Sequence, residues 1–238
     1  MNKQMKFHHP EGGFSLAELI IAMAITITIT GLACTLLARS MNLRWRANQK
    51  MDAMADAQRA LNIMSREIAN AGFNLSDNGL VPEDSITDEN GNSTIRIRSN
   101  LNKFDSSVSS AAQNGIGVAA EDVGEDVKYF LHAANNTNLL ARYDAYRGVG
   151  ATPTVLANRL DSLHIHYFGQ KVTYSTSNCD ISGPSSGEVA VSAAKFLVIA
   201  VCVEEPEVGT PGAPGYQPPT NVLLVSDVAL RNSYLSGY

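Results

Sequence analysis

Residues 14–38 read FSLAELIIAMAITITITGLACTLLA, and this stretch decides the fold of the chain. A helix that rises about 1.5 Å per residue over this length can cross a bilayer core of about 30 Å. Ile25–Thr30 alternates like a strand, but a lone strand cannot satisfy its backbone hydrogen bonds in lipid, so we expect helix there too. The stretch carries one charge, Glu18, near its start. It therefore predicts a membrane-anchoring helix at the amino terminus.

A carboxylate in a membrane helix needs a partner, because its insertion costs about 2.5–3.5 kcal/mol. The partner has to be a cation close to Glu18, in the same helix or in a neighbouring chain. The alternative is a plain signal anchor that tolerates an acidic residue near the interface. A cleavable secretory signal is not favoured, because the apolar run is too long and no small-x-small site follows it.

The residues GFSLAELI at 13–20, preceded by a short basic leader, resemble the amino terminus of type IV prepilins and type II secretion pseudopilins. In that family a membrane peptidase cuts after the glycine, which implies cleavage between Gly13 and Phe14. The resemblance also implies N-methylation of Phe14 by the prepilin peptidase/methyltransferase. The amine that this cleavage would create on Phe14 lies one helical turn from Glu18, and it could pair with Glu18 of its own or of a neighbouring chain. The resemblance further implies that Glu18 takes part in subunit assembly.

The length and composition suit an anchor plus one sizeable domain. The chain has 238 residues, of which 45% are hydrophobic and 17% are charged. Its net charge of −5 argues against general nucleic-acid binding. Basic residues lie on both sides of the apolar stretch, so the positive-inside rule alone does not set the topology. The resemblance implies a single-pass protein of the bacterial inner membrane with its head domain in the periplasm, which later enters a pilus or pseudopilus.

The helix is expected to continue past the membrane as an amphipathic half. Apolar residues recur there every three or four positions, namely Met54, Ala57, Leu61, Met64, Ile68 and Ala71. Gly72 is a plausible stop for this helix. The apolar stripe predicts packing on a sheet, with a soluble coiled coil as the alternative.

The remainder of the chain predicts loops and strands. The alternating or apolar segments are Ser93–Ser99, Asp126–Ala133, Leu139–Ala145, Val155–Phe168, Glu188–Glu204 and Asn221–Arg231. The proline-rich residues 205–220 are expected to form a loop. The expected fold class is α+β, with a long helix packed on an antiparallel sheet, as in the pilin fold. The expected parts are a leader (1–13), the transmembrane half of the helix (14–38), its amphipathic half (39–72) and a β-rich head (73–238).

Three further stretches resemble PilW-type minor pilins and J-type minor pseudopilins of type II secretion. They are Ser65–Phe73 at the expected helix end, the strand Leu160–Phe168 and the closing Val228–Asn232. This narrower resemblance implies other minor and major pilins or pseudopilins as partners. The inner-membrane assembly platform and membrane lipid are also implied.

Of the three cysteines, Cys34 lies in the membrane segment. Cys179 and Cys202 remain as a possible disulfide pair in an exported domain, with two free thiols as the alternative. The chain shows no hydrolase elbow, phosphate loop or zinc spacing, so neither catalysis nor a metal or other cofactor is expected.

Three polar groups invite a functional interpretation, but a structural one is favoured for each. His164 and His166 share a strand face, as metal ligands can, yet no further ligand completes a site in sequence, and an exposed strand face is expected. Asp88–Asn92 places oxygens at alternate positions, as calcium loops do, but its glycine is misplaced for an EF-hand and a solvated turn is expected. The acidic residues Glu121, Asp122, Glu125 and Asp126 are expected on the solvated surface.

The leading hypothesis is a minor pilin that helps to initiate or cap a type IV pilus. The second is a minor pseudopilin of a type II secretion system, which would share the fold and the processing. The third is a membrane-anchored adhesion or binding domain that merely uses the same export signal.

Overall fold

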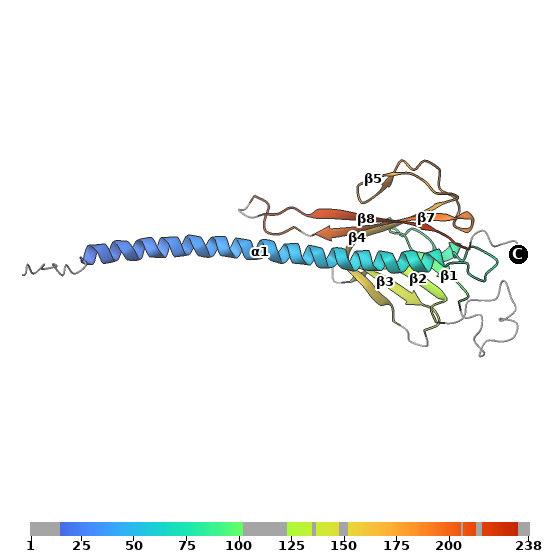
Figure 1. Ribbon diagram of the computed structural model, residues 1–238, viewed down its shortest axis with the longest axis horizontal. Coiled ribbons are helices and arrows are strands. Elements are labelled where there is room, and N and C mark those ends of the chain that lie inside the picture. The colour runs from blue at the N-terminus through green and yellow to red at the C-terminus, as the bar shows by residue number, and fades with distance from the viewer. Residues whose placement is uncertain are drawn as a thin grey trace, which may run out of the picture. The chain divides into compact units, whose positions relative to one another are not determined.

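The computed structural model describes residues 15–101, 123–134, 137–147, 152–205, 207–212 and 216–232. Gly13 and Phe14, the predicted processing residues, lie outside these ranges. The chain forms two compact units, Met1–Asn48 and Gln49–Tyr238. One long helix, α1 (Leu16–Ala69), contains the boundary between them (Figure 1).

The first unit is described as the amino-terminal part of α1. The predicted helix at Ile25–Thr30 is confirmed. The hydroxyl groups of Thr26, Thr28 and Thr30 each donate to the carbonyl oxygen four residues earlier, at 2.5–2.7 Å. These bonds satisfy the hydroxyls inside the helix, so that the outward surface of this segment is dominated by apolar groups.

The second unit contains a six-stranded antiparallel sheet with the order β1-β2-β3-β4-β7-β8. Its strands are β1 (Ile95–Arg98), β2 (Asp126–Ala134), β3 (Thr137–Asp144), β4 (Thr154–Phe168), β7 (Phe196–Glu205) and β8 (Thr220–Ala229). Short 3₁₀ helices lie at Pro82–Asp84 and Val191–Ala193. The long helix and the antiparallel sheet on which it packs confirm the predicted α+β class.

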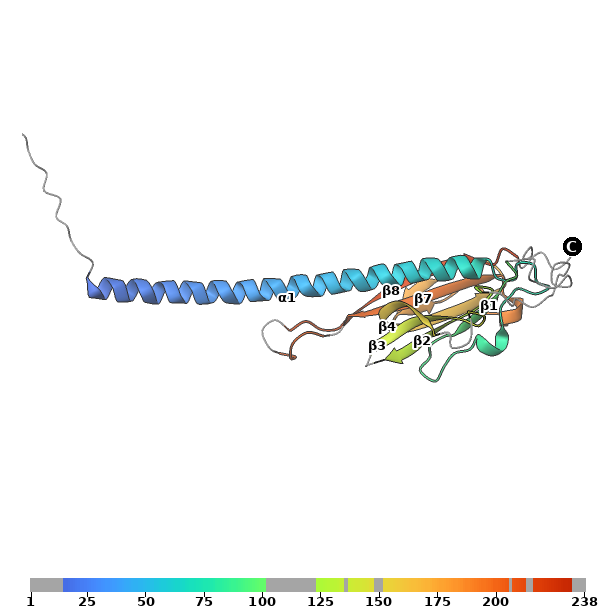
Figure 2. The same cartoon turned by 90° about the horizontal axis from the view of Figure 1, so that it is seen from below.

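The part of α1 that belongs to the second unit lies along one face of the sheet (Figure 2). The predicted apolar stripe is buried there, including Ala57, Leu61 and Ile68, in one cluster with sheet residues such as Leu163 and Ile199. Alanines on the helix let its backbone approach the sheet closely. Each fully buried aliphatic side chain contributes about 1.5–3 kcal/mol, so this stripe is a main source of the unit's stability.

Helix α1 ends at Ala69, two residues before the predicted end. The chain then turns back toward β1, and the backbone N–H of Gly72 donates to the carbonyl oxygen of Arg98 at 2.9 Å. Gly72 has a φ of +75°, and a Cβ there would lie 2.7 Å from the carbonyl oxygen of Asp77. Glycine is required because φ is positive and because the backbone of Asp77 and Asn78 passes so close to this position.

Strand β7 (Phe196–Glu205) lies within the predicted segment Glu188–Glu204 and extends one residue past it. The residues before the strand contain the 3₁₀ helix Val191–Ala193. The predicted loop at 205–220 contains a bridge between Val208 and Gln217, whose backbones exchange two hydrogen bonds of 2.9 Å. Residues 135 and 136, between β2 and β3, lie outside the described residues.

A small hairpin, β5 (Ser175–Ser177) and β6 (Asp180–Ser182), was not predicted. Its strands are too short to show an alternating pattern. Its two central turn residues, Asn178 and Cys179, have φ values of +48° and +65°, as the tightest hairpin turns require. The asparagine was the one local signal for this turn.

The hairpin belongs to a second, smaller apolar cluster on the sheet face opposite α1. Leu163 and Ile165 of β4 point toward the helix, so the alternate residue Phe168 points to the other side. It forms the second cluster together with Val198 of β7 and Ile181 of β6. The sheet is therefore covered by α1 on one face and partly by the hairpin on the other.

Candidate functional site

Glu18 has a structural role at the start of α1 that the sequence analysis did not predict. The backbone N–H of Ser15 donates to Glu18 Oε2 at 3.0 Å, and the N–H of Ala17 donates to Ser15 Oγ at 3.3 Å. This reciprocal arrangement is a capping box, and the spacing Ser-x-x-Glu is its sequence signature. Glu18 thus satisfies a backbone donor at the helix start, in addition to any role between subunits.

The helix surface that follows Glu18 is apolar and exposed. Leu19, Ile20 and Ile27 are 57%, 57% and 69% exposed, respectively. By length and composition, α1 is the helix in the described part of the chain that could cross a membrane. Trp45, which is 70% exposed, lies just past the apolar stretch, where tryptophan favours the interface between lipid and water. This segment is suited to anchoring the chain in a bilayer.

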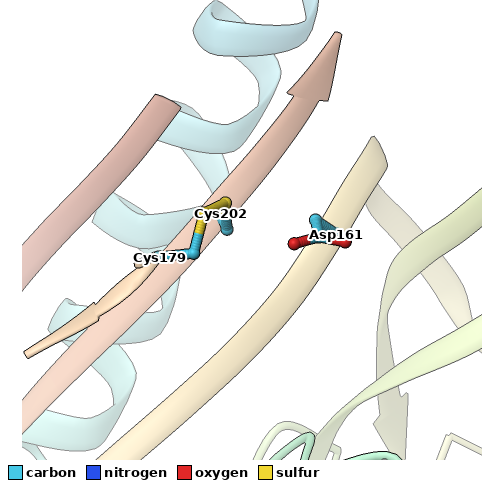
Figure 3. Close-up of side chains that lie close together, drawn as sticks. All are labelled: Asp161, Cys179 and Cys202. Atoms are coloured by element: carbon cyan, nitrogen blue, oxygen red, sulfur yellow. A yellow bond between two sulfur atoms is a disulfide. The ribbon is translucent and has the colours of Figure 1, made fainter. Parts of the chain in front are cut away.

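The structure joins Cys179 and Cys202 in a disulfide, with Cα atoms 5.3 Å apart (Figure 3). The bond links the turn of the β5–β6 hairpin to β7. A carboxylate oxygen of Asp161 lies within 4.8 Å of both sulfur atoms. Sulfur atoms bonded to each other are not thiolates, so in this state they do not serve as metal ligands. Cys34 is a free cysteine in the first unit.

Cys179→Ala should destabilise the second unit by about 3 kcal/mol, because it opens a loop that the disulfide closes in the unfolded chain. Urea unfolding of the full chain in detergent, with and without the substitution, measures this loss. Cys34→Ser serves as the shared background, so that the remaining thiols can be counted. Labelling of two thiols in the unreduced, denatured Cys34→Ser protein would show that Cys179 and Cys202 are not bonded in the second unit.

His164 and His166 do not lie on an exposed strand face, so that prediction is wrong. Both are half-buried, and carboxylates that follow in the chain approach them. His166 Nδ1 lies 2.7 Å from Glu188 Oε1, and His166 Nε2 lies 2.7 Å from Asp180 Oδ1. His164 Nδ1 is 3.9 Å from Asp180 Oδ2. Burial lowers the pKa of His166, but its bonds to Glu188 and Asp180 outweigh burial and raise that pKa above its ordinary value.

Glu125 and Asp126 are buried, which also corrects the prediction of a solvated surface. Glu121 and Asp122 lie outside the described residues. The carboxylate of Asp126 accepts two hydrogen bonds of 2.7 Å from the guanidinium of Arg96. Arg96 also donates to Asp84 at 2.6 Å, and this bond is the main cause that lowers the pKa of Asp84. Asp126 thus lies within an ion network, which supplies the partner that a buried carboxylate charge needs.

A second ion network joins α1 to the sheet. Tyr129 Oη on β2 and Arg142 Nε on β3 both donate to Glu67 Oε2 on α1, the latter at 3.1 Å. Tyr129 is fully buried, and burial is the main cause that raises its pKa. These contacts hold the last turns of α1 in one orientation on the sheet.

The stretch Asp88–Asn92 forms the predicted turn. Asp88 Oδ1 accepts hydrogen bonds from the backbone N–H groups of Asn90 and Asn92, at 2.9 and 2.8 Å. Asn92 Oδ1 accepts one from the N–H of Leu163 at 3.3 Å, along the edge of β4. These oxygens therefore stabilise the turn and its attachment to the sheet.

Comparison with known proteins adds little to this picture. No family model matches the sequence, and no curated protein matches it. Among solved structures, the chain is similar to a type IV-like pilin from Thermus thermophilus, with 13% identity and a TM-score of 0.37. The alignment covers 75% of this chain and 97% of that one. With so low an identity and TM-score, nothing about function is inferred from this similarity.

Proposed function

We propose that the chain is a minor pilin that takes part in type IV pilus assembly, in an initiation or tip complex. The main observation in support of the proposal is the position of Glu18 relative to the start of α1 and to the apolar surface of the helix. Glu18 lies in the first turn of the helix, and the apolar surface begins immediately after it. The predicted cleavage site between Gly13 and Phe14 lies just before this turn. The long helix and antiparallel sheet support the proposal.

In this function the apolar part of α1 anchors the protein in the bacterial inner membrane, with the second unit as a periplasmic head domain. The prepilin peptidase removes the leader and N-methylates Phe14. The mature chain then assembles with other minor and major pilins through the inner-membrane platform. A minor pseudopilin would share these steps, and a pilus assay beside a secretion assay distinguishes the two.

The membrane form should lack residues 1–13 and carry one added methyl group. Intact-mass spectrometry of the purified full-length gene product measures both changes at once. Gly13→Val should remain unprocessed, because a side chain next to the scissile bond obstructs the peptidase. Gly12→Ala is the matched control and should be processed normally. A membrane-bound wild-type protein that still begins at Met1 would contradict the proposed function.

A further inference from the structure

The β5–β6 hairpin, residues 175–182, is called the cap below. It has two strands of three residues each, and a two-stranded ribbon of this size is at best marginally stable by itself. Three attachments hold it against the sheet: the disulfide at Cys179, the apolar contacts of Ile181, and the contact of Asp180 with His166. Of these three, the contact with His166 depends on a group that titrates near neutral pH.

The geometry around His166 requires a particular protonation state. Each ring nitrogen lies 2.7 Å from a carboxylate oxygen, one of Glu188 and the other of Asp180. An ionised carboxylate only accepts hydrogen bonds, and a neutral imidazole has one N–H group. With both carboxylates ionised, only the doubly protonated imidazolium can donate to both. A neutral ring would turn a nitrogen lone pair toward one of the carboxylates.

We propose that His166 is a pH-operated clamp, which holds the cap on the sheet when its imidazole is protonated and loosens the cap when the proton is lost. Asp180 belongs to the cap itself, while Glu188 lies in the segment that returns the chain to β7. The imidazolium therefore ties both the cap and this return segment to β4.

The other charged groups near His166 fit this proposal. On β4, His164 shares the face of His166 and lies near the same Asp180 carboxylate, at 3.9 Å. On β7 the residue paired with His166 is the apolar Val198. On β8, Asp227 accepts a hydrogen bond from the hydroxyl of Tyr174 at 2.6 Å, so its carboxylate has its own donor just before the cap. Asp180 and Glu188 thus remain as the acceptors for His166.

The direction of the pH effect follows from the proton balance. The folded state binds the His166 proton more tightly than the unfolded state, whose histidine pKa is about 6.5. The stabilisation is therefore complete below about pH 6.5 and is lost as the pH rises through the higher pKa of the folded state. The cap should be tighter under acidic than under alkaline conditions.

The test uses the full chain in detergent micelles, with ¹⁵N-labelled histidine, titrated between about pH 6 and pH 9. Both ring nitrogens of His166 should stay protonated above about pH 6.5, the ordinary pKa of histidine, because each donates to a carboxylate. The exposed His132 of β2 is the position of the control variant. Asp180→Asn should lower the titration midpoint of His166, because one of the two carboxylates is then uncharged. His132→Gln is the matched control and should leave the midpoint unchanged.

Hydrogen exchange of the cap amides provides the second readout. The measured exchange rates are first corrected for the intrinsic pH dependence of exchange. The opening equilibrium constant of residues 175–182 should then rise as the pH passes the titration midpoint of His166. The rise should be about tenfold for each pH unit by which the pKa of His166 is raised in the folded state. His166→Gln should remove this rise, while His132→Gln should keep it. The proposal is overturned if His166 titrates at or below about pH 6.5, or if cap opening in the wild type does not change with pH.

Discussion

Gly79→Ala is expected to prevent the second unit from reaching its native fold. A Cβ added at Gly79 would lie 2.0 Å from the backbone nitrogen of Gly72 and 2.3 Å from the carbonyl oxygen of Arg98. These two atoms already form the hydrogen bond that fixes the end of α1 against β1. Backbone atoms cannot swing aside as a side chain can, so the crossing itself would have to open.

The expected cost exceeds about 4–5 kcal/mol, the range that single substitutions rarely pass. A domain is stable by only about 5–15 kcal/mol, so the second unit should be unfolded in most molecules of the variant. The cooperative unfolding transition of this unit should therefore be largely lost. Near-ultraviolet circular dichroism and urea unfolding of the full chain in detergent measure this loss.

Gly91→Ala is the matched control for this prediction. Gly91 also has a positive φ, +84°, but no neighbouring atom lies within 4 Å of an added Cβ. Only the backbone strain remains, which costs about 1–2 kcal/mol. If Gly79→Ala is no less stable than Gly91→Ala, the close crossing of the helix end and β1 is not a feature of the folded protein.

The parts of the fold that local periodicity determines could be predicted from the sequence. The three- and four-residue spacing of Ala57, Leu61 and Ile68 predicted the buried stripe of α1, and alternation predicted most strands of the sheet. The end of α1 was less predictable. It depends on the contact between Gly72 and Arg98, and the spacing of apolar residues carries no information on that contact.

The ion networks could not be predicted, because their members are brought together only by the tertiary structure. Glu67 is not part of the apolar stripe of α1, yet it binds Arg142, which is 75 positions away. His166 and Asp180 are closer in sequence, but they meet only because a hairpin too short to recognise folds back onto β4. In contrast, the capping box of Ser15 and Glu18 is entirely local, and the Ser-x-x-Glu spacing could have revealed it.

Glu18 therefore has two roles to separate: a structural role at the helix start and the proposed role in assembly. As a helix cap, its carboxylate oxygen accepts the N–H of Ser15. In assembly, its negative charge would pair with the amine of a mature Phe14 on an incoming subunit. Glu18→Ala removes both interactions, whereas Glu18→Gln keeps an oxygen that can accept the Ser15 hydrogen bond but removes the charge.

Both substitutions should reduce co-purification of partner pilins, and piliation or secretion, by at least about tenfold, since breaking a buried charge pair costs about 2–5 kcal/mol. Membrane insertion should persist, because loss of a charge makes insertion easier. The head domain should stay folded, since residue 18 belongs to the other compact unit. Wild-type and variant proteins are compared in the same strain, after intact mass has shown that each is processed. If Glu18→Gln assembles normally while Glu18→Ala does not, capping alone explains the residue; if both assemble normally, Glu18 has no role between subunits and the anchored-domain hypothesis gains.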